Sequence, residues 1–332
     1  MTKKIGVIGA GAWGTALAQS CALNGSEVVI WAREPEVVKT INEKHENSKF
    51  LPAVELDKKI TATESLTVAS DCDILLLVTP AQYTRTIIGS LKPDIAEGNL
   101  PLVICSKGIE IESGKLLSEV VREEVPYADV SVLTGPTFAS DIARGLPSAA
   151  TIAADDMDKA RMLQSDLSSK TLRLYATDDI MGAQIGGAIK NVIAIACGII
   201  EGMHLGDSAR AALITRGLAE MTRMSSVVGA NKETLMGMCG IGDLMLTCSS
   251  MQSRNFSLGV LLGQGKSLKD ILSMRNSVTE GVHTAKALKI MAEKHAIEMP
   301  ISSAVYKCLC ENISSEDAIE EILDRPLKRE NS

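Results

Sequence analysis

The stretch "IGVIGAGAWGTALAQSCALNG", residues 5–25, decides the fold of the N-terminal half. A short apolar run leads into Gly9, Gly11 and Gly14, spaced G-x-G-x-x-G, and a helical pattern follows directly. In such a turn the first glycine permits a tight bend, the second lets a pyrophosphate approach the backbone, and the third allows close helix–strand packing. The stretch therefore predicts a dinucleotide-binding turn. A purely structural glycine turn is the alternative.

Beyond this stretch, short β-rich runs alternate with helical patterns as far as residue 177. Strands are predicted at 4–9, 27–32, 73–79, 101–106, 129–135, 148–154 and 171–177, and helices at 12–24, 35–45, 81–90, 114–125 and 156–169. Continuous apolar strands separated by helices indicate a mostly parallel sheet that is covered on both faces. We predict a doubly wound α/β domain of Rossmann type, binding NAD(P), over residues 1–178.

The strand signal stops near residue 178, and only helical patterns follow. They cover 181–201, 208–228, 232–237, 257–263, 267–273, 280–295, 300–312 and 315–323. This predicts an all-α, substrate-binding domain over residues 179–332. A ligand site between the two domains is expected.

Composition excludes several classes of protein. The net charge is −7 with both signs mixed along the chain, which argues against a nucleic-acid binder. The eight cysteines contain no Cys-x-x-Cys pair, so reduced core cysteines in a cytoplasmic protein are expected, without metal. No signal region precedes the first strand. Residues 181–200 are long enough to raise the question of a membrane span, but their polar residues and four glycines favour a core helix without membrane insertion.

Lys190 lies within this apolar helix, "MGAQIGGAIKNVIAIACGII". An ammonium held away from water is costly unless it is paired or loses its proton. The face that carries Lys190 is small and polar, as a wall beside a ligand would be, and it also carries Gln184, Gly187, Asn191, Ala194 and Gly198. Lys190 is thus either a proton-transfer group or a lysine that reaches the surface.

Two further stretches favour the catalytic interpretation. Residues 239–259, "CGIGDLMLTCSSMQSRNFSLG", read as poor helix and are dense in anion-binding groups, including Asp243, Ser253, Arg254 and Asn255. "CSKGIE", 105–110, follows a strand and supplies a second lysine, Lys107. Two lysines, an arginine and an aspartate beside a cofactor cleft predict a dehydrogenase that acts on a small anionic, phosphorylated substrate.

The second predicted strand ends at "VVIWAREPE". An NAD site tends to place a carboxylate here for the ribose 2′-hydroxyl, whereas an arginine suits a 2′-phosphate. Arg33 precedes Glu34, which favours NADP and leaves NAD possible. Arg33 as an ordinary exposed residue is the alternative.

The sequence resembles bacterial NAD(P)-dependent glycerol-3-phosphate dehydrogenases along essentially its whole length. The motifs that carry the resemblance are "GAGAWGTALA", "NSKFLP", "CSKGIE", "TGPTFA", "GAIKNVIAIACGI", "AALITRGLAEM", "GIGDLMLTCSSMQSRNF" and "VTEGVHTA". The resemblance implies reversible reduction of dihydroxyacetone phosphate to sn-glycerol 3-phosphate, which supplies phospholipid synthesis.

The resemblance also implies roles for individual residues. Lys190 matches the general acid–base lysine. The positions that contact substrate are matched by Lys107, Gly135, Thr137, Lys190, Asp243, Ser253, Arg254 and Asn255. Those that contact NAD or NADP, with NADPH favoured, are Gly9, Gly11, Ala12, Trp13, Gly14, Arg33, Phe50, Lys107, Ala139, Arg254, Val278 and Glu280. Phe50 stands where a tyrosine is common.

Two alternatives remain open at this point. A related NADP-dependent reductase of another small anionic substrate, such as a ketopantoate or 3-hydroxyacid enzyme, shares the fold and also uses a lysine. A nucleotide-sensing regulator would keep the fold without catalysis, but it would need neither Lys107 nor Lys190. We expect a homodimer that binds a small-molecule substrate.

Overall fold

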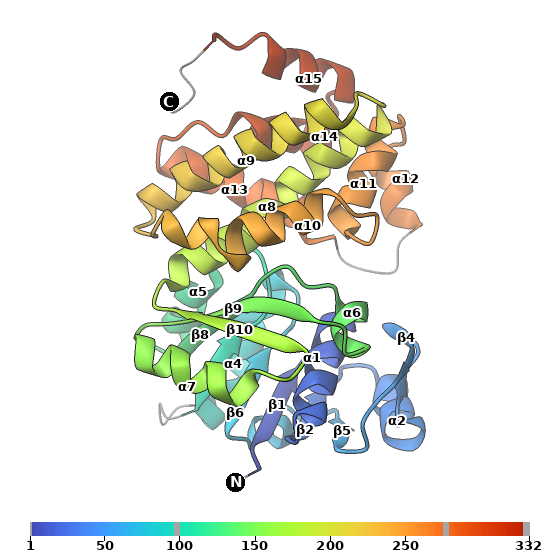
Figure 1. The fold of residues 1–332 in the computed structure, drawn as a ribbon, viewed down its shortest axis with the longest axis vertical. Coiled ribbons are helices and arrows are strands. Elements are labelled where there is room, and N and C mark those ends of the chain that lie inside the picture. The colour runs from blue at the N-terminus through green and yellow to red at the C-terminus, as the bar shows by residue number, and fades with distance from the viewer. Residues whose placement is uncertain (1, 96–99, 275–278, 328–332) are drawn as a thin grey trace.

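The computed structural model describes residues 2–95, 100–274 and 279–327, arranged as two stacked halves (Figure 1). An eight-stranded sheet with its helices forms the lower half in this view, and helices alone form the upper half. This arrangement confirms the predicted fold class.

The sheet is almost entirely parallel. Its strands are β1 (Lys4–Ile8), β2 (Glu27–Trp31), β5 (Ile60–Thr63), β6 (Ile74–Leu77), β7 (Pro101–Ile104), β8 (Asp129–Thr134), β9 (Ser148–Ala154) and β10 (Leu172–Thr177). The order is β10-β9-β8-β7-β6-β1-β2-β5, and the β8–β9 pair alone among the described pairs of this sheet is antiparallel. The chain runs outward in opposite directions from β1 and β6. Ligands of doubly wound sheets bind at such a switch point, beyond the carboxyl ends of the strands.

Alternate residues of the central strands enter different cores, because successive side chains of a strand point to opposite faces. In β6, Ile74 and Leu76 join the core beneath α1 (Ala12–Leu23), α2 (Pro35–Lys44) and α7 (Met157–Leu167). Leu75 and Leu77 join the opposite core, beneath α3 (Leu66–Ser70), α4 (Thr84–Ile95) and α5 (Leu117–Glu124). The sheet is therefore covered on both faces, as predicted.

Several small elements were not predicted from the sequence. They are the edge strand β5, the hairpin of β3 (Glu46–Asn47) and β4 (Leu51–Glu55), and the short helices α3 and α6 (Ala139–Ala143). Polar residues or proline break up the apolar residues of each, unlike the continuous apolar run of the equally short β6. The helix predicted at 81–90 begins as the 3-10 turn η1 (Ala81–Tyr83) and continues as α4.

The helical half is built around α8 (Ile180–Gly202), which is buried along almost its whole length. Around it lie α9 (Asp207–Val227), η2 (Glu233–Met236), η3 (Met238–Gly242), α10 (Asp243–Cys248), α11 (Arg254–Gly263), α12 (Leu268–Ser273), α13 (Glu280–Lys294), α14 (Pro300–Cys310) and α15 (Ser315–Leu323). By length and composition α8 could cross a membrane, but its apolar span lies wholly inside the molecule. The prediction of a core helix is confirmed.

Glycines let α8 and α11 touch backbone to backbone. A Cβ atom on Gly198 would lie 2.1 Å from the carbonyl oxygen of Phe256, and one on Gly259 would lie 2.1 Å from that of Ile195. Side chains at these positions would push the helices apart. The small residues of α8 that the sequence assigned to a ligand wall therefore serve, at this end, as a helix-packing surface.

The prediction that residues 239–259 are poor helix is wrong. The segment forms the last four residues of the π-helical turn η3, then α10, and the first part of α11. Tertiary packing overrides the low propensity of its glycines. Gly240 packs so tightly that a Cβ would lie 2.0 Å from the Leu235 carbonyl oxygen.

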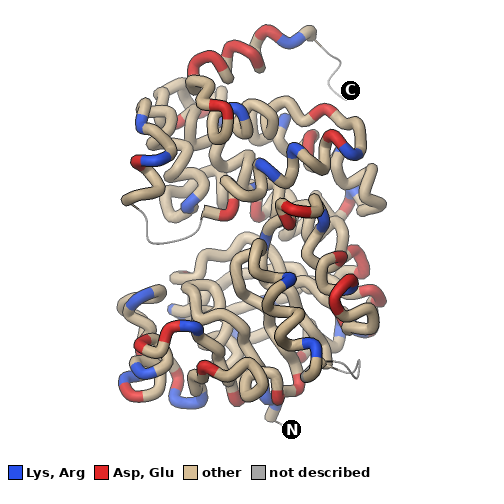
Figure 2. The backbone as a smooth tube through the Cα atoms, turned by 180° about the vertical axis from the view of Figure 1, so that it is seen from behind, with Lys and Arg blue, Asp and Glu red and all other residues tan. Residues whose placement is uncertain are grey.

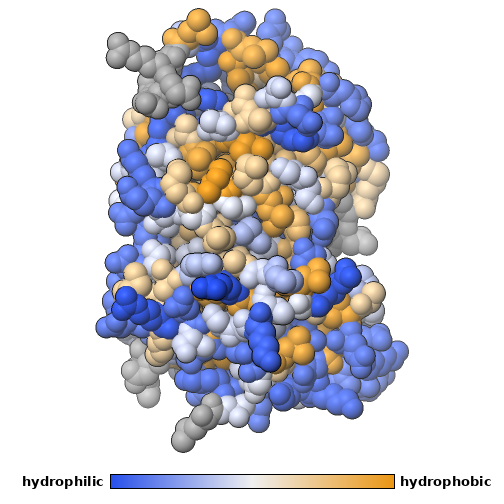
Figure 3. All heavy atoms as spheres, viewed as in Figure 1, coloured by the Kyte–Doolittle hydropathy of each residue, from blue (hydrophilic) through white to orange (hydrophobic). Residues whose placement is uncertain are grey.

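The surface matches the balanced composition of the chain. Figure 2 shows lysines and arginines interspersed with acidic residues over both halves. On the face in Figure 3, hydrophobic residues gather mainly over the helical half, whereas the sheet half is mostly hydrophilic.

Candidate active site

The glycine-rich turn lies at the switch point, directly after β1. Gly9 has φ +121°, a conformation that favours glycine, and a Cβ there would lie 3.0 Å from the Val78 carbonyl oxygen. A Cβ on Gly14 would lie 1.9 Å from the Gly9 carbonyl oxygen, so Gly14 is needed for helix–strand contact. Around Gly11, no atom of the described residues comes within 4 Å of such a Cβ. This leaves room for a phosphate to approach the backbone.

The N-terminus of α1 has the properties of an anion site. Among the described residues no side chain caps it, and its first turn, which includes Ala12 and Trp13, holds no acidic residue. Its N–H groups are therefore available to a pyrophosphate. These observations fit a bound dinucleotide. Trp13 Nε1 also donates to the Cys105 carbonyl oxygen at 3.1 Å, which links the turn to the end of β7.

A buried asparagine that the sequence analysis did not single out fastens the β3–β4 hairpin to this turn. Asn47 is 1% exposed, and its amide nitrogen donates to the Ala10 carbonyl oxygen and to Thr15 Oγ1, both at 2.8 Å. Its amide oxygen accepts the Phe50 N–H at 3.2 Å. Phe50 is thereby held near the glycine-rich turn. The motif "NSKFLP" was the available signal.

Arg33 lies just beyond β2, at the same edge of the sheet. Its side chain is 75% exposed, and its guanidinium is 3.2 Å from Glu34 Oε1. It is thus accessible to a cofactor phosphate while being paired to a neighbouring carboxylate.

Lys190, Lys107 and Asp243 meet in the interior, and we name these three residues the lysine centre. Asp243, with no exposed surface, accepts from Lys190 Nζ at one carboxylate oxygen and from Lys107 Nζ, at 2.8 Å, at the other. Lys190 Nζ also donates to Thr247 Oγ1 at 2.8 Å, and Lys107 Nζ to the Gly135 carbonyl oxygen at 2.9 Å. Two ammonium groups share one carboxylate.

Burial lowers the pKa of Lys190 to about 7. The negative charge of Asp243 opposes this shift, while the positive charge of Lys107 adds to it. Lys190 is 5% exposed, so it does not reach the surface as the alternative interpretation required. A lysine with a pKa near neutrality can both give and accept a proton.

Four elements bring the lysine centre together. Lys190 projects from α8 and Asp243 opens α10, whereas Lys107 and Gly135 follow the carboxyl ends of β7 and β8. Thr247, four residues after Asp243 on α10, shares its helix face, and that spacing was the signal for its role. Thr137 is half-buried and donates to the Gly135 carbonyl oxygen at 3.3 Å.

The N-terminus of α11 carries three of the predicted substrate-contacting residues, Ser253, Arg254 and Asn255. The Ser253 hydroxyl caps the helix by accepting the Phe256 N–H at 3.2 Å. The Arg254 side chain reaches the surface. The Asn255 side chain is buried, donates to Asn191 Oδ1 at 2.9 Å and accepts the Gly281 N–H at 2.9 Å. The Asn255 amide therefore fastens α8, α11 and α13 to one another.

The remaining cofactor candidates lie on both halves. Ala139 begins α6, and α6 packs against α1. Glu280 begins α13 and accepts the Ala81 N–H at 3.3 Å, across the two halves. Burial raises the pKa of Glu280, and the nearby charge of Arg254 opposes the shift. Val278 lies outside the described residues.

A dinucleotide turn is linked through Trp13 to the loop of Lys107, whose partly buried ammonium group shares Asp243 with the buried Lys190. This arrangement defines the class: a nicotinamide-dependent dehydrogenase with two halves. Comparison with known proteins gives the family. Models described as "NAD-dependent glycerol-3-phosphate dehydrogenase" N-terminus and C-terminus match residues 4–160 and 179–320. The chain belongs to the NAD-dependent glycerol-3-phosphate dehydrogenase family, and it is an oxidoreductase that uses NAD or NADP.

Individual relatives are similar to this chain over almost its full length. A glycerol-3-phosphate dehydrogenase [NAD(P)+] from Parvibaculum lavamentivorans is 52% identical, covering 99% of this chain and 98% of the relative. One from Rhodospirillum rubrum is 51% identical, covering 98% and 93%. The crystal structure of the Coxiella burnetii glycerol-3-phosphate dehydrogenase superposes with a TM-score of 0.93 at 36% identity, covering 98% and 99%.

Proposed function

We propose that the lysine centre carries out proton transfer in the reversible conversion of dihydroxyacetone phosphate and sn-glycerol 3-phosphate. The buried pairing of Lys190 with Asp243 is the observation that carries this proposal. When bound, the reduced nicotinamide supplies the hydride for C2 of the ketone. In that direction Lys190 Nζ donates a proton to the C2 oxygen, and in reverse it removes the proton of the C2 hydroxyl.

Lys107 stabilises the same oxygen electrostatically. With all three groups ionised, the lysine centre carries one net positive charge in a site shielded from water. Negative charge that develops on the substrate oxygen is stabilised by preorganised positive groups in such a site. Asp243 holds both ammonium groups in place, and Thr247 fixes the direction of Lys190.

The substrate phosphate is bound at the N-terminus of α11 in this proposal. The guanidinium of Arg254 and the backbone N–H groups of Arg254 and Asn255 supply positive charge and donors there. Because the Asn255 amide binds Asn191 and Gly281, its part is in the backbone and in positioning the helix. Phosphate binding away from the reacting carbon orients the carbonyl.

Gly9, Gly11, Ala12 and Gly14 would hold the pyrophosphate of the cofactor at the switch point. Trp13, Phe50, Ala139 and Glu280 border it in this proposal, and Arg33 binds the 2′-phosphate, which favours NADPH. The exposure of Arg33 and the tether of Phe50 to the turn support this assignment.

In this proposal one half of the molecule binds the cofactor and the other binds the substrate. We propose an NAD(P)-binding domain over residues 1–178 and a substrate-binding domain over 179–332, since β10 ends at Thr177 and α8 begins at Ile180. The family suggests a cytoplasmic homodimer that supplies phospholipid synthesis. Light scattering would give twice the chain mass of 35.3 kDa for a dimer, and the single-chain mass would contradict it.

An assay of reduced-nicotinamide absorbance tests the function. Dihydroxyacetone phosphate and dihydroxyacetone are each supplied with NADPH and with NADH. We expect oxidation that requires the phosphate, with NADPH preferred, and an Arg33→Ala variant that loses this preference. No oxidation by protein shown to bind NADPH would reject the assignment, and equal rates without the phosphate would reject the phosphate site.

A further inference from the structure

The loop that carries Lys107 is held by both halves of the molecule. It leaves β7 at Cys105, which belongs to a core of the sheet half. Ile109 and Leu116, both fully buried, instead belong to the core of the helical half. The position of this loop therefore sets where Lys107 meets Asp243, a residue of the helical half.

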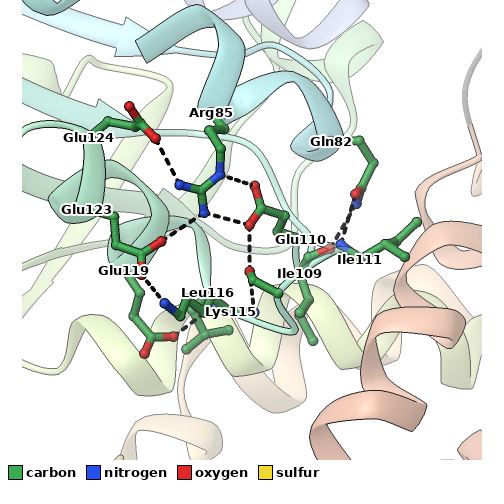
Figure 4. Close-up of polar contacts among 11 residues, drawn as sticks. Gln82, Arg85, Ile109, Glu110, Ile111, Lys115, Leu116, Glu119, Glu123 and Glu124 are labelled. Carbon is green, nitrogen blue, oxygen red and sulfur yellow. Dashed lines mark hydrogen bonds and ion pairs between the residues drawn. The ribbon is translucent and has the colours of Figure 1, made fainter. Parts of the chain in front are cut away.

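One arginine on the sheet half binds this loop through a two-point contact. Arg85 of α4 donates from Nε to Glu110 Oε1 at 2.9 Å and from Nη2 to Glu110 Oε2 at 2.8 Å (Figure 4). The same guanidinium binds Glu123 at 2.8 Å and Glu124 at 2.9 Å, both on α5. Arg85 thus ties the loop to α5 as well as to α4.

Neighbouring contacts leave the loop little freedom. Gln82 of η1 donates to the Ile109 carbonyl oxygen at 2.8 Å and accepts the Ile111 N–H at 3.0 Å, on either side of Glu110 (Figure 4). A Cβ on Gly108 would lie 2.7 Å from the Ala81 Cβ, so the backbone next to Lys107 rests directly on η1. The loop is pinned from Gly108 to Ile111.

The Arg85–Glu110 pair is an ion pair with fixed geometry. The Glu110 side chain is only 9% exposed, and its hydrogen bonds with Arg85 lower the pKa of its carboxyl below the ordinary value despite burial. A two-point guanidinium–carboxylate contact fixes orientation as well as distance. The Arg85 side chain is 33% exposed, and an ion pair open to solvent adds little net stability, so the main effect of this pair is geometric.

We propose that Arg85 and Glu110 are positioning residues that hold the Lys107 loop so that its ammonium group stays on Asp243 and the Gly135 carbonyl. The proposal rests on the role of Lys107 in the proposed function. Neither residue touches substrate or cofactor in this account. Without the pair, only the contacts with Gln82 and η1 hold the loop, and we expect Lys107 Nζ to lose the 2.8 Å and 2.9 Å contacts that orient it.

Glu110→Gln tests the proposal because glutamine keeps the size and removes the charge. We expect kcat to fall between about tenfold and 100-fold, the range for misplacing a catalytic group, with the KM for NADPH unchanged. Glu124→Gln is the matched control, because Glu124 binds the same guanidinium but lies on α5 and not on the loop. This variant should retain normal kcat. Equal losses in both variants would overturn the proposal.

A double-mutant cycle separates positioning from general damage. In a Lys107→Met background, Glu110→Gln should cause no further loss of kcat, because the group it positions is gone. If the kcat losses of the two substitutions multiply, the positioning role of Arg85 and Glu110 is wrong, while the proposed role of Lys107 stands. Normal kcat for Lys107→Met alone would instead overturn the proposed role of Lys107, and with it the positioning role of Arg85 and Glu110.

A conservative variant keeps the test valid if Glu110→Gln does not fold. Glu110→Asp retains the charge on a shorter side chain, so it should fold and still lower kcat, by less than the glutamine variant. Melting curves identify any loss that comes from unfolding. A folded Glu110→Asp protein with the parent kcat would contradict the requirement for exact spacing between Arg85 and the loop.

Discussion

At the scale of single residues, the lysine centre depends on the buried carboxylate of Asp243. Asp243 is fully buried and neutralises two ammonium groups, of which Lys190 is 5% exposed. Removing one partner of a buried charge pair leaves the other charge uncompensated, which costs more than the pair itself contributes. We therefore expect Asp243 to be needed for both folding and catalysis.

We predict that Asp243→Asn lowers the free energy of unfolding by about 3–5 kcal/mol and abolishes turnover, because both lysines lose their counter-charge. Thr247→Val is the matched control on the same helix face. It removes one hydrogen bond to Lys190 and should cost about 1 kcal/mol. Denaturant unfolding measures both. Similar losses in the two variants would show that Asp243 acts as an ordinary hydrogen-bond acceptor.

The pKa of Lys190 predicts opposite pH profiles for the two directions. Its described charged neighbours are Asp243 on α10, which raises that pKa, and Lys107, which lowers it, while burial brings it to about 7. Burial raises the pKa of the nearby Cys248 thiol well above its ordinary value, so this thiol stays neutral near pH 7. Ketone reduction needs protonated Lys190, so kcat/KM should fall about tenfold per pH unit above 7.

Alcohol oxidation needs neutral Lys190, so its kcat/KM should rise with pH up to about 7 and then level off. Initial rates in both directions between pH 5 and 10 measure these profiles, with stability checked at each pH. An inflection near the ordinary lysine pKa, in either direction, would contradict the proposed effect of burial.

At the scale of elements, the β1–turn–α1 unit contains one glycine that packing requires, Gly14, and one that leaves room for a ligand, Gly11. A Cβ on Gly14 meets the Gly9 carbonyl oxygen at 1.9 Å, whereas one on Gly11 meets no atom of the described residues within 4 Å. We predict that Gly14→Ala lowers the melting temperature and weakens NADPH binding, while Gly11→Ala keeps the melting temperature and weakens only binding. Calorimetry on both variants checks this, and normal NADPH affinity of Gly11→Ala would remove the phosphate from the turn.

The elements also show how far sequence reasoning reaches. Strands and helices with a continuous or periodic apolar pattern were predicted, because burial on one or both faces leaves that signal, as in β6 and α8. β5 and the β3–β4 hairpin are short and lack that signal, and Pro52 further obscures β4. The helix at 243–248 was missed because Gly240 and Gly242, which precede it, resemble glycines of a loop, although Gly240 packs against the Leu235 backbone.

The candidate site could be predicted to a similar degree. Lys190, Lys107 and Asp243 were singled out by charge in apolar or strand-end positions, and the fold brings them together. The motif around Asn47 was visible, but the partners of Asn47 and the turning of the Asn255 amide toward Asn191 could not be predicted, because these partners are far away in the sequence. Side-chain direction inside a packed core is a tertiary property.

At the scale of the whole molecule, the two halves share their cores. Ile180 and Ala183 of α8 pack with the sheet, and Ile109 and Leu116 of the β7 loop pack with the helices. We predict a single cooperative thermal transition, because neither half keeps a closed core alone. Calorimetry should give equal calorimetric and van't Hoff enthalpies of unfolding. Two separate transitions, or a sheet half that survives melting of the helices, would contradict this.

The most direct test of the central claim is the turnover of a Lys190→Met variant with dihydroxyacetone phosphate and NADPH. Methionine keeps the apolar stem within α8 and removes the proton that Lys190 gives to the C2 oxygen. We predict a kcat lower by about 10²–10⁴-fold, with the NADPH dissociation constant unchanged in a fluorescence titration. Turnover close to that of the unmodified enzyme would show that Lys190 does not transfer the proton.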